Sequence, residues 1–364
     1  MKIFGWSNAA GGVHHYRIRE PLRGLALRGH ETRSLPVATA EIFEQYDVVL
    51  VRGLHNPKNS LLWRWAAQTN QPALRVYDLD DDIWAWREGT KEYKYWDDNR
   101  RLEAELNIQC ADLVTAPTHN LAELLSDLNP RLAVLPNTIP RKLLQLNPNH
   151  RNRFIIGWQG AQQHTADLRL IYDPVLRFML RHSDVELHLW GPEKLEQYLP
   201  AFDERIICYP WIQSVWGHYM RLSMDIGLAP IDPTDRFNET KSDIKIREYA
   251  ALGIPFIASK SDAYTQTTLA ARGFLAETEQ DWEDGLEELY KNRNLRYQMS
   301  EQGRLRARLW TTEENGIEWE RAYERAKHTR KLRESPGVIL SPESSYQQTR
   351  GGKPIANVPT SGRF

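Results

Sequence analysis

The sequence predicts an α/β protein built from two doubly wound domains, each with a parallel sheet that helices cover on both faces. Short strands and helices alternate along most of the 364 residues, and this alternation is typical of parallel sheets. A stretch rich in Pro and Asn, residues 136–152, interrupts the alternation, which then begins again. The length is sufficient for two domains with a smaller appendage.

We therefore expect a first domain over residues 1–146, a second over 147–311, a helix over 312–334 and a tail over 335–364. The tail is expected to be flexible, because Ser, Pro, Gly and Gln dominate it and large apolar residues are few.

The elements expected in the first half are short strands separated by helical patterns. The strands are expected at residues 2–6, 48–52, 74–79, 113–116 and 132–135, and the helices at 16–28, 61–68, 99–110 and 120–126. The second half repeats this arrangement. Its strands are expected at residues 154–158, 185–190, 206–209, 226–229 and 256–258, and its helices at 167–181, 217–224, 242–252 and 282–292.

Composition excludes several classes of protein. Hydrophobic residues make up 41% and charged residues 26% of the chain, as in an ordinary soluble protein. A net charge of −1 argues against a protein that binds nucleic acid through its overall charge, but it does not exclude a local basic groove. The two cysteines suggest neither a disulfide scaffold nor a zinc site. With no signal peptide or long apolar run evident, a cytoplasmic location is expected.

The most informative segment is KSDIKIREYAALGIPFIAS, residues 241–259. Ser242 is expected to cap the N-terminus of a helix, because its hydroxyl can accept from the free N–H groups of the first turn. Gly253 is expected to end the helix in a left-handed conformation, and Pro255 prevents its continuation. A short strand should follow.

Two charged side chains of this helix point to a ligand. Lys245 and Glu248 are three residues apart, so they lie on one face. The helix N-terminus carries partial positive charge and Lys245 adds a full charge, which suits a diphosphate. Glu248, one turn deeper, can accept both hydroxyls of a ribose. This arrangement fits a nucleotide-diphosphate sugar, although a solvated amphipathic helix is the plainer alternative.

The same segment resembles the donor-binding helix of GT-B glycosyltransferases of the large retaining group. The matching residues are Ser242, Lys245, Glu248, Tyr249, Ala251, Gly253, Pro255 and Ser259. The resemblance implies two Rossmann-like domains with the active site in the cleft between them, and a helix over 312–334 that crosses back to the first domain. It also implies a nucleotide-diphosphate sugar, such as a UDP-sugar, as co-substrate, with no metal and no other cofactor.

The loop after the first strand contains Gly11 and Gly12, which allow a tight turn and a close approach of the backbone to a phosphate or sugar. A plain turn is the alternative. The resembling family has a glycine-rich loop at this place, under the donor, so both glycines are candidate donor-binding residues.

The first domain offers two further candidates near the expected cleft. His55 follows the strand 48–52, where a catalytic or sugar-contacting histidine would suit, and a capping or solvated histidine is the alternative. Asp80 belongs to an acidic cluster that ends the strand 74–79. A metal-binding D-x-D motif is one interpretation of this cluster, and contact with the acceptor or helix capping is the one we prefer.

The second domain departs from the resembling family at two places. The Arg and Lys that relatives often carry after the first strand are absent, and Gly160 and His164 stand in that region with polar neighbours. The position of the first glutamate of the family's pair holds Thr240. Trp211 follows another strand and can stack on the nucleobase, although core packing is an alternative.

The function expected from these features is sugar transfer from a nucleotide-diphosphate donor to an acceptor hydroxyl, with Lys245 stabilising the leaving charge. The resemblance implies that the transfer proceeds with retention. The acceptor is expected to be a bacterial surface glycan. The alternative acceptor is a hydroxymethylated DNA base, since residues 91–101 interleave aromatic and basic side chains. A non-catalytic sugar-nucleotide or glycan-binding protein and a nucleotide-sugar epimerase remain as alternatives of other classes.

Overall fold

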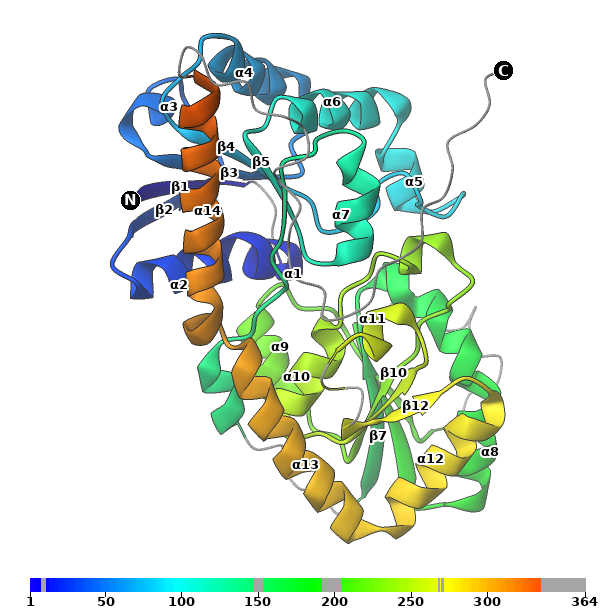
Figure 1. Cartoon of the computed structure of the whole chain (residues 1–364). Coiled ribbons are helices and arrows are strands. Elements are labelled where there is room, and N and C mark those ends of the chain that lie inside the picture. The colour runs from blue at the N-terminus through cyan, green and yellow to red at the C-terminus, as the bar shows by residue number, and fades with distance from the viewer. Residues whose placement is uncertain (8–10, 147–152, 192–203, 268, 270–271, 335–364) are drawn as a thin grey trace, which may run out of the picture.

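The computed structural model describes residues 1–7, 11–146, 153–191, 204–267, 269 and 272–334. The tail expected at residues 335–364 lies outside the described residues. Two lobes are stacked one above the other, and each contains one sheet with helices on both sides (Figure 1). No helix in the described ranges combines the length and the apolar character that crossing a membrane requires.

The first sheet is parallel throughout its described strands, in the order β2-β1-β3-β4-β5-β6. Its strands are β1 (Lys2–Trp6), β2 (Glu31–Leu35), β3 (Val48–Arg52), β4 (Leu74–Asp78), β5 (Leu113–Ala116) and β6 (Leu132–Val134). The helices of this lobe are α1 (Gly11–His14), α2 (Glu20–Leu27), α3 (Ile42–Gln45), α4 (Pro57–Gln68), α5 (Lys91–Tyr95), α6 (Asp98–Gln109) and α7 (His119–Ser126).

The second sheet is also parallel, in the order β12-β11-β10-β7-β8-β9. Its strands are β7 (Phe154–Gln159), β8 (Val185–Trp190), β9 (Ile206–Tyr209), β10 (Ile226–Ala229), β11 (Phe256–Ser259) and β12 (Phe274–Ala276). The helices that follow are α8 (Tyr172–Arg181), α9 (Val215–Arg221), α10 (Ile244–Leu252), α11 (Asp262–Thr265), α12 (Glu279–Lys291), α13 (Arg293–Ala307) and α14 (Thr312–Glu334). The predicted fold class of two doubly wound domains is confirmed.

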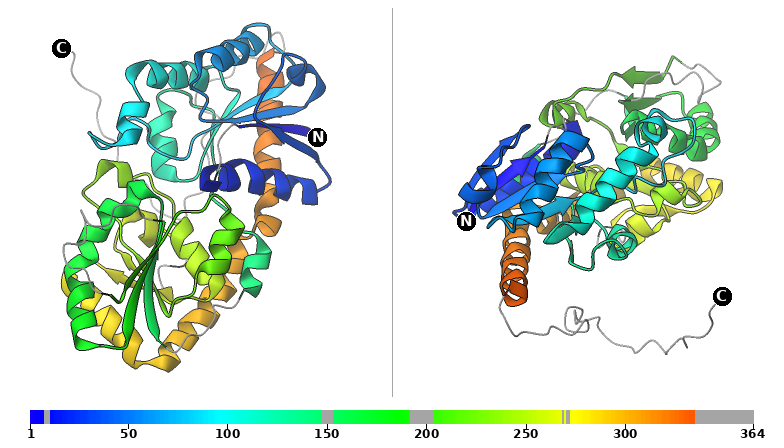
Figure 2. Two further views of the ribbon diagram at one scale, coloured as in Figure 1. Left: turned by 180° about the vertical axis from the view of Figure 1, so that it is seen from behind. Right: turned by 90° about the horizontal axis from the view of Figure 1, so that it is seen from above.

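Each sheet has a point where the strand order reverses, and these two points face each other. In the first sheet β1 lies between β2, which follows it in the chain, and β3, which comes next. In the second sheet β7 lies in the same way between β8 and β10. Loops at the carboxyl ends of strands on both sides of such a point leave a crevice in which ligands collect. The left view of Figure 2 shows the dark-blue helices α1 and α2 at the junction of the lobes.

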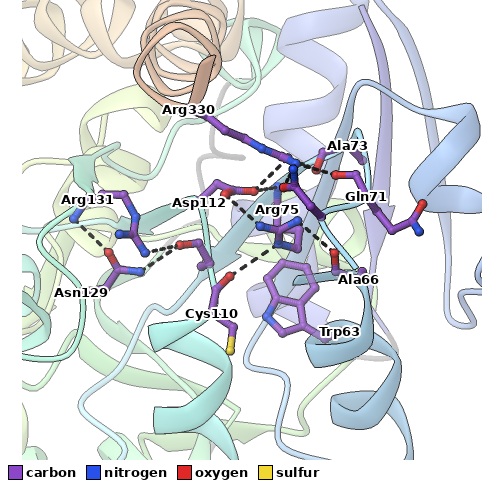
Figure 3. A network of polar contacts seen from close by, with 12 residues as sticks. Trp63, Ala66, Gln71, Ala73, Arg75, Cys110, Asp112, Asn129, Arg131 and Arg330 are labelled. Atoms are coloured by element: carbon purple, nitrogen blue, oxygen red, sulfur yellow. Dashed lines mark hydrogen bonds and ion pairs between the residues drawn. The ribbon is translucent and has the colours of Figure 1, made fainter. Parts of the chain in front are cut away.

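The helix α14 returns to the first lobe, as the resemblance implied. Trp319 and Tyr323 are buried in the core cluster of the first sheet, beside Ile3 and Val48. At the far end of the helix, Arg330 is held by the first lobe (Figure 3). Its guanidinium donates to the carbonyls of Ala73 at 2.8 Å and Gln71 at 2.6 Å, and it lies 3.3 Å from Asp112.

Four hydrophobic clusters, two for each sheet, form the described core. The chain passes between the lobes twice, and the two crossing segments pair beside each other. Ile139 and Thr311 form a parallel bridge, and the Thr138 and Thr312 hydroxyls are 3.0 Å apart. The segments that connect the lobes are therefore held together by backbone and side-chain hydrogen bonds.

Candidate functional site

A cavity of about 410 Å³ lies between the lobes, within the range of small-molecule sites. Loops at the carboxyl ends of strands from both sheets form its walls. The first lobe contributes Gly11, Gly12, Val13, Tyr16, Asp80, Asp81 and Asn137. The second lobe contributes Gln159, Gly160, Ala161, His164, Asp167, Trp211, Ile212, Gln213, Val215, His218, Pro230, Ile231, Lys241, Ser242, Ile244, Lys245, Glu248 and Tyr264.

The helix α10 presents its N-terminus to this cavity. It begins at Ile244 rather than at Ser242, so the prediction that Ser242 caps it is wrong. The capping position belongs to Asp243, whose carboxylate pairs with Arg247 at 2.6 Å and makes no capping hydrogen bond. The first N–H groups of α10 therefore have no side-chain cap. Gly253 ends the helix with a φ of 69°, which confirms the predicted left-handed end.

Lys245 is a cation on the cavity wall. Its ammonium lies 4.7 Å from the centre of the Trp158 ring and forms no hydrogen bond or ion pair with any described residue. Burial lowers the pKa of Lys245 to about 8, while the carboxylates of Asp167 and Glu248 act in the opposite direction. The side chain is therefore mostly protonated at pH 7 and is available to an anion.

Glu248 lies on the same face of α10, and its carboxylate is buried. The Tyr16 hydroxyl donates to one oxygen, and Gln159 Nε2 donates to the other at 2.5 Å. Burial raises the pKa of Glu248, and the hydrogen bonds from Tyr16, Tyr219 and Gln159 oppose that rise. Both carboxylate oxygens thus accept hydrogen bonds from neutral donors, one of which belongs to the first lobe.

The acidic cluster after β4 is paired with cations. Asp80 accepts from Arg52 Nε at 3.0 Å, and Asp81 is 2.6 Å from the Lys241 ammonium across the lobes. In the described part of the chain, no group of three or more His, Cys, Asp or Glu side chains could hold a metal ion. The pair of Asp81 and Lys241 joins the lobes, whereas the pair of Asp80 and Arg52 lies within the first lobe.

Two sequence candidates lie outside the cavity lining. His55 is half-buried among aromatic side chains, with Nε2 2.7 Å from the Tyr95 hydroxyl and its ring 4.4 Å from that of Trp96. Burial lowers the pKa of His55. Thr240 is buried, and its carbonyl accepts from the Thr118 hydroxyl at 2.9 Å across the lobes. The structure therefore places both residues outside the lining of the cavity.

The other candidates of the second lobe line the cavity. Gly160 follows β7, and its N–H donates to the Trp190 carbonyl at 3.1 Å. Burial and the nearby cations lower the pKa of His164 well below its usual value. Trp211 is 40% exposed, so its ring is open to a ligand.

The glycines of the first lobe start the helix α1 at the cavity wall. Gly11 has a φ of 71°, a conformation that favours glycine. The preceding residues 8–10 of the predicted glycine-containing loop lie outside the described residues. Because a helix begins at Gly11, the loop is shorter and the helix earlier than the sequence led us to expect.

Sequence reasoning missed several residues that define the site. Tyr16, Asn137, Gln159, Asp167 and His218 all line the cavity. The carboxylate of Asp167 accepts from the Asp232 N–H at 3.3 Å and from an amide hydrogen of Asn238 at 3.0 Å. None of these residues belongs to a motif with fixed spacing. Their role depends on which loops the two sheets bring together.

No family model matches the sequence, and no curated protein matches it. Solved structures do match along nearly the whole described architecture. Sucrose-phosphate synthase from Thermosynechococcus elongatus is 12% identical, with a TM-score of 0.64, and the match covers 90% of this chain and 100% of that one.

Another matching structure is HepE from Anabaena in complex with UDP-glucose, which is 12% identical with a TM-score of 0.61, and the match covers 91% of this chain and 99% of that one. The catalytic domain of starch synthase IV from Arabidopsis thaliana, bound to ADP and acarbose, is 11% identical with a TM-score of 0.59 and covers 90% and 99%. The chain has the GT-B fold. At these sequence identities the structural similarity establishes the fold alone.

Proposed function

We propose that this protein is a glycosyltransferase that moves a sugar from a nucleoside-diphosphate donor to an acceptor hydroxyl. The observation that carries the proposal is the pair Lys245 and Glu248 on one face of α10, lining a cavity between two GT-B lobes. A cation at a helix N-terminus suits a diphosphate, and a buried carboxylate one turn deeper suits the hydroxyls of a ribose.

The proposed chemistry needs stabilisation of the departing diphosphate more than it needs a nucleophile. Lys245 and the uncapped N–H groups of α10 would hold the charge that develops on the leaving oxygen. The Trp211 ring, which lines the cavity, would stack on the nucleobase. We propose transfer with retention and without a metal ion, with Asp80 near the acceptor.

The neighbours support a nucleotide donor but differ in the base. The Anabaena protein was solved with UDP-glucose and the Arabidopsis domain with ADP. UDP and UDP-glucose are therefore the first probes we propose, with ADP and GDP in parallel. A glycan hydroxyl is the acceptor we propose.

A hydroxymethylated DNA base is a second candidate acceptor, favoured by one surface feature. Tyr93 and Tyr95 on α5 are 39% and 50% exposed. Arg101 lies 5.6 Å from the Tyr93 ring and Arg100 lies 4.8 Å from the Tyr95 ring. Aromatic rings with neighbouring cations are the elements that bind single-stranded nucleic acid.

The deciding experiment is a thermal-shift panel of UDP, ADP, GDP and UDP-glucose on the wild type and on Lys245→Ala and Glu248→Ala. We expect one nucleotide to stabilise the wild type and to have much less effect on both variants. Lys260→Ala, which removes an exposed cation paired with Glu277, is the control and should behave as the wild type. If no nucleotide shifts the wild-type melting temperature, the donor site is elsewhere or absent.

Turnover separates a transferase from a binding protein. Slow hydrolysis of UDP-glucose without an acceptor, lost in Lys245→Ala, is the expected result. Binding without any hydrolysis or transfer would instead favour a non-catalytic sugar-nucleotide-binding protein, and an interconverted donor sugar would favour an epimerase.

A further inference from the structure

Asn137 lies where the chain first passes between the lobes, and it touches both of them. It is 7% exposed and lines the cavity. Its Oδ1 accepts from Arg17 Nη1 of the first lobe at 3.1 Å, and its Nδ2 donates to Ser242 Oγ of the second lobe at 3.0 Å. Its carbonyl accepts from Arg247 Nη1 at 2.5 Å.

The guanidinium of Arg17 is fixed before it meets Asn137. It is fully buried and forms two hydrogen bonds with the Asp78 carboxylate, at 3.0 and 2.6 Å. The same Nη1 that reaches Asn137 also donates to the Leu135 carbonyl at 2.7 Å. A side chain held by these bonds offers a donor in one fixed direction.

Chemistry then determines how the amide of Asn137 is oriented. Arg17 can only donate, so it must face the amide oxygen, and the NH₂ group must face Ser242. The Ser242 oxygen therefore acts as an acceptor from Asn137. A hydroxyl has one hydrogen of its own to donate, and none of the described residues accepts the one of Ser242. Ser242 lines the cavity three residues before Lys245.

We propose that Asn137 is a positioning residue that keeps the Ser242 hydroxyl hydrogen directed at the terminal phosphate of the bound nucleoside diphosphate. This inference rests on the proposed function, because it assigns a second donor to the same diphosphate that Lys245 would hold. In this proposal a residue at the junction between the lobes contributes to recognition of the donor. Ser242 contacts the phosphate, and Asn137 acts through Ser242.

A purely structural role for Asn137 makes a different prediction. A residue that only joins the lobes would change the affinity of every ligand by the same factor. A residue that aims a hydroxyl at the terminal phosphate changes the affinity of the diphosphate more than that of the monophosphate or the nucleoside. The ligand series UDP, UMP and uridine, or the series of whichever base stabilises the wild type, separates the two roles.

The test is calorimetric titration of that series into the wild type, Asn137→Ala, Ser242→Ala and the double variant. The loss of one hydrogen bond to a charged group lowers the affinity by roughly tenfold to hundredfold. We expect each single variant to weaken UDP by about that factor while uridine is nearly unaffected. The double variant should be no weaker than Ser242→Ala alone, because Asn137 acts through that hydroxyl.

Two further variants keep the test informative if Asn137→Ala does not fold. Ser242→Thr keeps a hydroxyl and should restore most of the affinity for UDP. Asn137→Asp keeps the size and the acceptor for Arg17, but its second carboxylate oxygen would accept the Ser242 hydrogen and turn it away from the cavity. We expect Asn137→Asp to lose affinity for UDP at least as strongly as Ser242→Ala.

The outcomes distinguish this inference from the function on which it rests. If the wild type binds UDP and Asn137→Asp binds it equally well, the inference is wrong and the proposed function stands. Equal losses for UDP and uridine would assign Asn137 a structural role and overturn the inference as well. If the wild type binds no nucleotide, the proposed function fails and the inference fails with it.

Discussion

The charge of Lys245 should make nucleotide binding depend on pH with a definite sign. Burial lowers its pKa to about 8 in the unliganded protein, and a bound diphosphate should raise it again, because the phosphate favours the ammonium form. The protein should therefore take up about half a proton per ligand at pH 8. From pH 7 to pH 9 the protonated fraction falls from about nine-tenths to about one-tenth, so the dissociation constant should rise about tenfold.

Stability without ligand should respond in the opposite direction. The folded-state pKa of Lys245 is lower than the ordinary value of 10.5, so between pH 8 and 10.5 the unfolded chain binds more protons at this group. The contribution of this group to the free energy of unfolding therefore increases as the pH rises through that window. As the pH rises above 8, the affinity for the nucleotide should therefore fall while the stability of the free protein increases. The opposite signs distinguish these two effects of the Lys245 side chain.

Isothermal titration of UDP-glucose at several pH values, in two buffers of different ionisation enthalpy, measures both the affinity and the proton uptake. The diester phosphates of this donor carry a constant charge, and burial keeps the pKa values of His164 and His218 below the window. Lys245→Met should bind weakly at every pH and take up no proton. A dissociation constant that stays level from pH 7 to pH 9 in the wild type would refute the assignment.

Three other substitutions test separate parts of the argument. Trp211→Ala should weaken nucleotide binding by about 0.5–1.5 kcal/mol through lost stacking, while competition by pyrophosphate is unchanged, as measured by titration. Arg17→Met should lower the free energy of unfolding by about 3–5 kcal/mol in urea, because it leaves the Asp78 carboxylate buried without its partner. Gly316→Ala should lower the free energy of unfolding by about 1–3 kcal/mol, measured as a lower melting temperature. The added Cβ would lie 2.7 Å from the Gly24 carbonyl oxygen, where α14 crosses α2.

Matched controls exist for the two stability predictions. Arg28→Met breaks a surface pair with Glu320 and should cost at most about 1 kcal/mol. Gly285→Ala is also a substitution in a helix, but its Cβ would meet side chains and no backbone atom, with the end of the Ile257 side chain nearest at 3.1 Å. Stability changes as large in the controls as in the test variants would show that the buried pair and the close helix crossing are not the cause.

Most of the fold could be predicted because its central strands are short apolar runs between clear boundaries. β3 and β5 begin and end where the sequence placed them. The missed elements lack such a signal. β2 is a polar edge strand, mostly exposed, and α13 buries little besides Gly303 and Ala307, which leaves few apolar positions to set a period. Edge strands and surface helices follow from the elements beside them, which a single sequence does not show.

The site was predicted where one helix contains it and was missed where two lobes build it. Lys245 and Glu248 are on one face because of the helical period alone. The donors that surround the Glu248 carboxylate come from Tyr16, Gln159 and Tyr219, on three elements that are far apart in the sequence. The packing inside the second lobe sets the distances of Gln159 and Tyr219 from Glu248, and the packing of the two lobes sets that of Tyr16. For the same reason the charge of Asp81 could be noticed in the sequence, but its partner Lys241 could not.

The segment that joins these features is the π-helical turn at His15–Arg19, between α1 and α2. Such turns are frequent at functional sites, and two consecutive side chains of this one make contacts at the junction of the lobes. Tyr16 reaches Glu248 in the cavity, and Arg17 reaches Asp78 in the first core and Asn137 at the crossing. A change of this turn would therefore disturb the carboxylate of Glu248 and the orientation of Asn137 together, which makes it the structural link between the core of the first lobe and the donor side of the cavity.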